Sequence, residues 1–216
     1  MEGIPVTKSI SSYIIQSQDE EIKRIALELH EGVGQTLYSL YTGLQYIEMG
    51  IEQPGMKAYL QEMQQTMERT IKEIQMLSVE LHPPTLSLGL VSAIKSYVRL
   101  YTSTYGIVVK VESIGEEKIL PEQNKIAIFR VCQEALINIA KFADIDSASI
   151  QLDWREDDIK VVIVDHGQGF NVKKVLRENL SSGLGAMQER MLLAGGTCDI
   201  ASEQGKGTRI LIDMPL

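Results

Sequence analysis

The chain has 216 residues, of which 44% are hydrophobic and 23% are charged, the balance of a globular protein with one large domain or two small ones. Twenty-one basic and 29 acidic residues give a formal charge of −8, which argues against direct nucleic-acid binding, because a nucleic-acid surface needs a basic face. Two cysteines are too few for a disulfide framework or a cysteine-rich zinc site, and they favour a reducing, cytoplasmic location. Only three histidines could serve imidazole chemistry: His30, His82 and His166.

Neither a targeting signal nor a membrane span is predicted. The first residues lack a basic stretch followed by an apolar one, and no apolar run approaches the ~20 residues that cross a bilayer. Residues 1–17 are expected to be a linker or the stub of a signalling helix. Any membrane attachment would run through a sensor region that this chain does not contain.

Two long helices are predicted next. Between residues 18 and 49 apolar residues recur every three or four positions, which places them on one helix face. They are Ile22, Ile25, Leu29, Val33, Leu37, Leu40, Leu44 and Ile47. A glycine- and proline-containing break at 50–55 is followed by a second set: Met56, Leu60, Met63, Met67, Ile71, Ile74, Leu77 and Leu81. A lone helical hairpin cannot bury both stripes, so we expect a homodimer with a four-helix bundle.

The chain changes character at Pro83-Pro84, which end the second helix. Beyond it, helices are predicted at 88–105, 121–143 and 186–194. Strands are predicted at 107–111, 149–154, 159–164, 197–202 and 208–214, where β-branched residues are concentrated. Helices interleaved with hairpins predict an α/β sandwich. The expected domains are therefore a helical domain at 18–84 and an α/β domain at 85–216.

The first candidate site lies on the first long helix. His30 directly follows the apolar position Leu29, so it lies at the edge of the stripe or just outside it, next to the carboxylate of Glu31. A hydrogen bond to a carboxylate raises the basicity of an imidazole and makes it a better nucleophile. Gln35, five residues on, can converge on the same side. The alternative is a solvated helix face that happens to contain a histidine.

The second candidate site is in the α/β half. Three glycine-bearing segments follow one another at 165–170, 183–185 and 205–208, and glycine allows a backbone to approach a phosphate closely. Upstream, Glu134, Asn138 and Lys141 share one face of a predicted helix, a set that suits Mg²⁺ and phosphate. The alternative for the glycine segments is that they form ordinary hairpin turns, and the alternative for the polar helix face is that it is simply exposed to solvent.

Together these motifs resemble the catalytic core of bacterial two-component sensor histidine kinases. The resemblance is to the subfamily with a type-3 dimerisation and phosphoacceptor domain, whose partners are response regulators of the NarL/LuxR type. The motif at 24–35 is similar to the H-box of that subfamily, and the motif at 130–143 to its N-box. The three glycine segments are similar to its G1, G2 and final glycine boxes.

The resemblance implies a role for each matching residue. His30 would accept the γ-phosphoryl group of ATP, Glu31 would orient it and act as its base, and Gln35 would position water for dephosphorylating the regulator. Asn138 would ligate Mg²⁺, beside Glu134 and Lys141. Asp165 would read the adenine amino group. The nucleotide pocket would be shaped by Gly167, Gly169, Gly183, Gly185, Gly207 and Thr208.

Four positions depart from the family pattern. Glu31 stands where Asp is usual, Phe142 where His is common, His166 where a second Asp is frequent, and Ser181-Ser182 where Gly-His is common. None removes an expected metal or adenine contact, but they bear on ATP affinity and lid closure. Phe142, Ser182 and Glu31 support an alternative function, a dimeric adaptor that keeps the kinase fold without turnover, whereas the intact Asp165 and Asn138 argue against it. An anti-sigma serine kinase shares the ATP-binding fold, but an H-box hairpin is not expected there.

Overall fold

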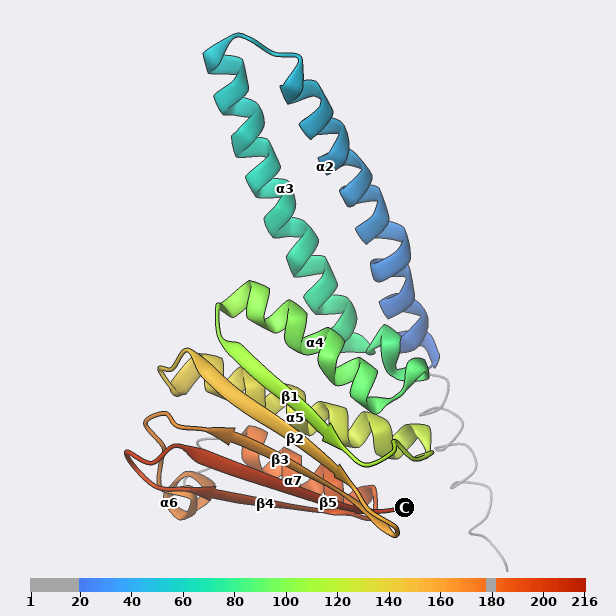
Figure 1. The fold of residues 1–216 in the computed structure, drawn as a ribbon, viewed down its shortest axis with the longest axis vertical. Coiled ribbons are helices and arrows are strands. Elements are labelled where there is room, and N and C mark those ends of the chain that lie inside the picture. Colours follow the sequence, from blue (N-terminus) through green and yellow to red (C-terminus); the bar gives the residue numbers. More distant parts are fainter. Residues whose placement is uncertain (1–19, 178–181) are drawn as a thin grey trace, which may run out of the picture. The chain divides into compact units, whose positions relative to one another are not determined.

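The computed structural model describes residues 20–177 and 182–216 (Figure 1). The chain divides into two compact units between Pro84 and Thr85. The expected linker at 1–17 lies outside the described residues. Among the helices of the described part, none is both long and apolar enough to cross a bilayer.

The first unit is a helical hairpin. Its first helix runs from residue 20 to Met49 and contains a π-helical segment, η1 (Glu28–Val33), followed by α2 (Gly34–Met49). The second helix, α3 (Pro54–Leu81), begins with a proline, whose missing N–H costs nothing in the first helical turn. It ends where His82 takes an extended conformation before Pro83, as the sequence predicts.

Polar side chains join the two helices near both ends of the hairpin. The buried hydroxyl of Ser78 donates to the backbone carbonyl of Ala26 at 2.8 Å. Near the turn, the side-chain amides of Gln61 and Gln64 donate to the Glu48 carboxylate at 2.7 and 3.0 Å. These two amide bonds lower the pKa of Glu48 below its usual value, that of Gln61 having the larger effect.

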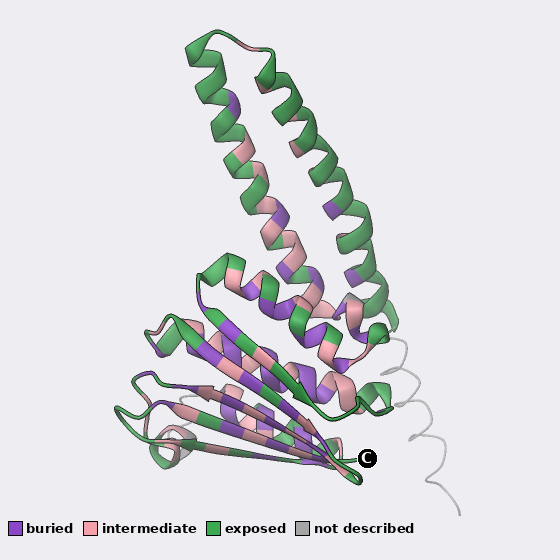
Figure 2. Ribbon diagram, in the orientation of Figure 1, coloured by how far each residue is buried: buried purple, intermediate pink, exposed green. Residues whose placement is uncertain are grey.

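Much of the hairpin surface is exposed, as Figure 2 shows. The exposed surface of the first helix includes large apolar side chains: Ile22, Ile25, Leu27, Val33, Tyr38, Leu40, Tyr46, Ile47 and Met49. Exposed apolar side chains along a helix are the feature that a partner helix would cover.

The second unit is a five-stranded mixed sheet with strand order β1-β2-β3-β5-β4. β1 and β2 pair in parallel, and the other neighbouring strands pair antiparallel. A short 3₁₀ segment, η2 (Pro84–Leu88), begins at the last residue of the first unit and leads into the second. The elements that follow are α4 (Leu90–Tyr105), β1 (Val108–Ile114), α5 (Glu122–Phe142), β2 (Ser147–Trp154), β3 (Asp158–Asp165), α6 (Val172–Arg177), α7 (Ser182–Leu193), β4 (Thr197–Ser202) and β5 (Thr208–Pro215).

The core of this unit lies between the sheet and the helices α4, α5 and α7 (Figures 1 and 2). In β2 and β3 every second residue is buried, so each strand turns one row of side chains to the helices. Tyr97 and Phe129 meet edge to face, with ring centroids 5.7 Å apart, and join α4 to α5. Burial raises the pKa of the Cys132 thiol on α5 to about 12.

The predicted fold class, a helical region followed by an α/β sandwich, is confirmed. Two local predictions differ. α7 begins at Ser182 rather than near residue 186, so Gly183 and Gly185 lie inside its first turn instead of in a preceding loop. The short helix α6 was not predicted, because six residues are too few for a helical pattern to emerge from the sequence.

Candidate functional site

The hairpin carries His30 in the third position of η1, where its side chain is exposed. The turn is π-helical because the N–H of Gly34 donates to the carbonyl of Leu29, five residues back. Glu31 and Gln35 are exposed as well. The three predicted residues therefore lie on accessible surface of one helix within two turns, where a second reactant can approach the imidazole.

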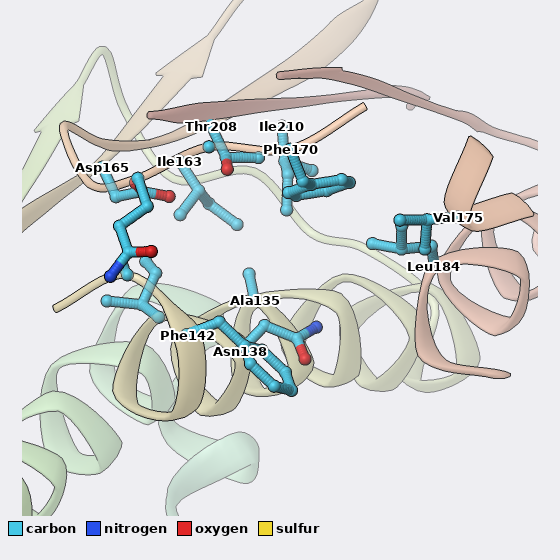
Figure 3. Close-up of a pocket in the computed structure, with 14 residues that line it drawn as sticks. Ala135, Asn138, Phe142, Ile163, Asp165, Phe170, Val175, Leu184, Thr208 and Ile210 are labelled. Atoms are coloured by element: carbon cyan, nitrogen blue, oxygen red, sulfur yellow. The ribbon is translucent and has the colours of Figure 1, made fainter. Parts of the chain in front are cut away.

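A cavity of about 380 Å³ opens in the second unit between α5 and the sheet (Figure 3). Apolar side chains dominate its wall, with a small number of polar groups, as is usual for sites that hold a small organic molecule. The lining residues are Ala135, Asn138, Ile139, Phe142, Ala143, Ile163, Asp165, Gln168, Gly169, Phe170, Val175, Leu184, Thr208 and Ile210.

Asp165 is the buried polar group of this cavity. It ends β3 and is only 5% exposed. Its Oδ1 accepts a hydrogen bond from the N–H of Gly167 at 2.8 Å, so the loop that follows the strand fixes the carboxyl group. In the register of the sheet Asp165 is opposite Thr208, which brings two predicted site residues together across β3 and β5.

The glycines of the first and last loops allow these loops to pack backbone against backbone. Gly169 and Gly207 have positive φ angles of 59° and 78°, which favour glycine. A β-carbon at Gly207 would overlap the carbonyl oxygen of Asp165, and one at Gly169 would overlap that of Glu203. A β-carbon at Gly167 would lie 2.5 Å from the carbonyl oxygen of Ala143. Of these three, only Gly169 lines the cavity; Gly167 and Gly207 support its rim.

α5 and α7 bring a further group of predicted residues together. Asn138 lines the cavity, and its Nδ2 donates weakly to the Glu134 carboxylate at 3.4 Å. That carboxylate lies directly against Gly183, where a β-carbon would overlap Oε1. Glu134, Gly183 and Gly185 are thus beside the cavity but not in its wall. Lys141 is exposed on the last turn of α5, outside the wall.

The positions that depart from the family pattern have different surroundings. Phe142 lines the cavity although 68% of its surface is exposed, so its ring stands at the rim. His166 is exposed. Ser181 lies outside the described residues, and Ser182 begins α7.

Ser202 is a supporting residue that sequence reasoning missed. Its Oγ accepts from the N–H of Phe170 at 2.9 Å and donates to the carbonyl of Gly207 at 2.8 Å. It also lies 3.2 Å from the Thr208 hydroxyl. One hydroxyl therefore ties together the two glycine loops that frame the cavity. No motif marks it, because its bond to Phe170 joins residues 32 positions apart in the sequence.

Sequence reasoning also did not predict that the apolar residues of the cavity wall form one group. On α5, Ala135, Asn138, Ile139 and Phe142 follow helical spacing, a signal that could have shown that they share a face with the predicted Asn138.

Family models of known proteins match both parts of the chain. A HisKA_3 family model, described as histidine kinase, matches residues 21–86. A HATPase_c model, described as histidine kinase-, DNA gyrase B- and HSP90-like ATPase, matches residues 123–216. The histidine kinase domain of the blue-light activated histidine kinase from Erythrobacter litoralis EL346 covers 84% of this chain and is itself covered to 94%, with a TM-score of 0.52. At 14% identity, that likeness concerns the fold alone.

Two relatives extend over nearly the whole chain. The oxygen sensor histidine kinase NreB of Staphylococcus carnosus (strain TM300) is 32% identical over 205 residues, which are 94% of this chain and 58% of that protein. The signal transduction histidine-protein kinase/phosphatase DegS of Brevibacillus brevis is 30% identical over 207 residues, 94% of this chain and 53% of that protein. The chain thus spans little more than half the length of these relatives. With a HisKA_3-type helical hairpin followed by an ATPase-type α/β domain, the chain belongs to the histidine kinases.

Proposed function

We propose that this chain is the catalytic core of a sensor histidine kinase, which phosphorylates itself on His30 with ATP and then passes the phosphoryl group to an aspartate of a response regulator. The observation that carries the proposal is the combination, in one chain, of an exposed imidazole within the HisKA_3 match and a largely apolar cavity within the ATPase match.

The cavity suits the base of ATP. Its wall is apolar, and the buried carboxyl of Asp165 provides an acceptor inside it. One carboxyl oxygen is engaged by Gly167, which leaves the other to accept a hydrogen bond from the adenine amino group. An acceptor at this place favours adenine over guanine, which presents a carbonyl there instead.

The residues beside the cavity fit a magnesium ion with the ATP phosphates. The side-chain oxygen of Asn138, with the Glu134 carboxylate nearby, is a donor set of the kind that Mg²⁺ takes together with phosphate oxygens and water. Within the described residues no cluster of three or more His, Cys, Asp and Glu side chains forms a metal cage, which agrees with an ion held largely by its nucleotide. When bound, Mg²⁺ would neutralise charge on the phosphates.

In the first reaction, a ring nitrogen of His30 forms a bond to the γ-phosphorus, the bond to the β,γ-bridging oxygen breaks, and ADP leaves. Glu31 orients the imidazole and takes its proton. In the second reaction, an aspartate carboxylate of the regulator attacks the phosphohistidine and frees His30. Gln35 would hold a water molecule for hydrolysis of the aspartyl phosphate, which makes the chain a phosphatase as well.

The partners belong to the same proposal. A homodimer is supported by the exposed apolar side chains on the first helix, which a second copy would cover in a four-helix bundle. A NarL/LuxR-type regulator is suggested by the type-3 helical region, and phosphatase activity by the printed name of DegS. Two free, buried cysteines suit a reducing cytoplasm.

Incubation with γ-labelled ATP tests the proposal. The wild-type chain is expected to gain a label that is stable in base and lost in acid, and His30→Gln should take up none. Asp165→Asn should also lose the label, because the nucleotide no longer binds, while His30→Gln keeps nucleotide binding in a calorimetric titration. Nucleotide binding without label transfer in the wild-type chain would instead identify the inactive adaptor.

A further inference from the structure

The helix that carries His30 has one residue more than its buried face requires. Along residues 20–49 the residues that are buried or half-buried are Ala26, Leu29, Gly34, Leu37, Tyr41, Leu44 and Glu48. The steps between them are 3, 5, 3, 4, 3 and 4 residues. Removal of a single residue from the step of five would leave a regular alternation of three and four, the pattern of a helix packed along its whole length.

The step of five coincides with η1. An α-helix turns about 100° per residue, so five residues would carry a side chain about 140° away from its starting face. A π-helical turn holds one more residue than an α-turn, and the bond from the Gly34 N–H to the Leu29 carbonyl spans this step. The wide turn therefore absorbs the extra residue and returns Gly34 to the buried face.

Four of the exposed apolar residues on this helix have one interval that is longer than the others. Ile25, Val33, Leu40 and Ile47 are exposed and are separated by 8, 7 and 7 residues. Seven residues are two turns of a packed helix, so the first interval also contains one residue too many. The excess falls between Ile25 and Val33 in the sequence itself, where the structure has η1.

The hairpin holds both flanks of this turn in place. On one side, Ser78 donates to the Ala26 carbonyl; on the other, Gln61 and Gln64 bind Glu48. The helix segments before and after η1 are both bonded to α3. The wide turn therefore determines the direction of the side chains inside η1. His30, near the middle of η1, is one of them.

From these observations we infer that η1 is the positioning element of the phosphoacceptor, and that its extra residue sets the direction of the His30 ring without being needed for the stability of the hairpin. The inference rests on the proposed autokinase activity. About half of the extra 100° precedes His30, so in an uninterrupted α-helix its ring would lie roughly 4 Å from its present position. A displacement of ~1 Å can cost a reaction about a hundredfold in rate.

Three variants of the full chain test the inference. Deletion of Gly32 removes the extra residue and leaves both flanks in register as a plain α-helix. Gly32→Ala keeps the chain length, and its β-carbon meets nothing within 4 Å, so it controls for the loss of glycine. Deletion of Thr42, which lies in the regular part of α2, turns the flank that carries Glu48 by about 100°.

The melting temperature of the Gly32 deletion should equal or exceed that of the wild type, whereas the Thr42 deletion should melt several degrees lower. In autophosphorylation assays, the Gly32 deletion should lose at least tenfold in kcat with an unchanged KM for ATP, because the nucleotide site lies in the other unit. Gly32→Ala should stay within threefold of the wild type.

Two results would overturn the inference. A Gly32 deletion as unstable as the Thr42 deletion would mean that the hairpin contains no extra residue. A Gly32 deletion with a wild-type kcat would mean that the turn does not position His30. If the proposed autokinase activity itself were wrong, the wild-type chain would take up no label. The melting temperatures of the variants would still show whether the hairpin contains an extra residue.

Discussion

At the scale of single residues, Phe142 is the departure from the family pattern with the clearest surroundings. Its ring lines the cavity, yet 68% of its surface is exposed, so it adds little to the core of its unit. An exposed aromatic ring at the rim of a nucleotide cavity can stack on a base or cover it from solvent. Where other family members have an imidazole, this chain therefore keeps a flat ring without a titratable group.

Phe142→Ala should weaken nucleotide binding while leaving the fold intact. Loss of one aromatic contact, worth ~1 kcal/mol, predicts a rise of roughly fivefold in the dissociation constant for ATP. Isothermal titration of ATP measures the change, and Phe142→His is the matched control that restores a ring. An unchanged dissociation constant for Phe142→Ala would show that the ring does not contact the nucleotide.

At the scale of elements, polar side chains join the two helices of the hairpin near both of its ends. Glu48 is the titratable member of these side chains, and amide bonds from Gln61 and Gln64 lower its pKa. A carboxyl whose pKa is lower in the folded state stabilises that state above its unfolded pKa, and this contribution disappears as the pH falls through the folded pKa.

The turn end of the hairpin should therefore lose stability in acid, below the ordinary glutamate pKa of about 4.5. Glu48→Gln keeps a side chain of similar shape but cannot titrate, so the melting temperature of its hairpin should depend less on pH between about 5 and 3. Circular dichroism melts over this range compare the two proteins. Equal slopes for both would rule out Glu48 as a source of the pH dependence.

At the scale of the whole molecule, the two candidate sites lie in different compact units: the first unit carries the exposed imidazole of His30, and the second contains the cavity. Each unit should therefore respond to its own ligand. A dimerising hairpin gains stability with protein concentration, whereas a nucleotide domain gains stability with nucleotide.

Scanning calorimetry of the chain should thus resolve two transitions. One should move upward as the protein concentration rises, and the other should move upward with Mg·ATP, by an amount set by about 2.7 kcal/mol at a hundredfold excess over the dissociation constant. His30→Gln should leave the nucleotide-dependent shift unchanged. A single transition that responds to both additions would contradict independent units.

The sequence by itself determined the parts that depend on local chemistry. Prolines at 83–84 ended α3, alternating apolar residues marked the strands, and the glycine motifs appeared in the order that the family shares. These signals are readable because each depends on residues that are close in the chain.

Tertiary structure decided what depends on distant partners. The π-helical turn at His30 lies between two flanks that are both hydrogen-bonded to α3. Ser202 gained its role from two loops that only the sheet brings together, and Gly183 became part of a helix against Glu134. Hydrogen bonding and close packing between segments far apart in sequence settled the surroundings of Ser202 and Gly183, and no local sequence pattern predicts such contacts.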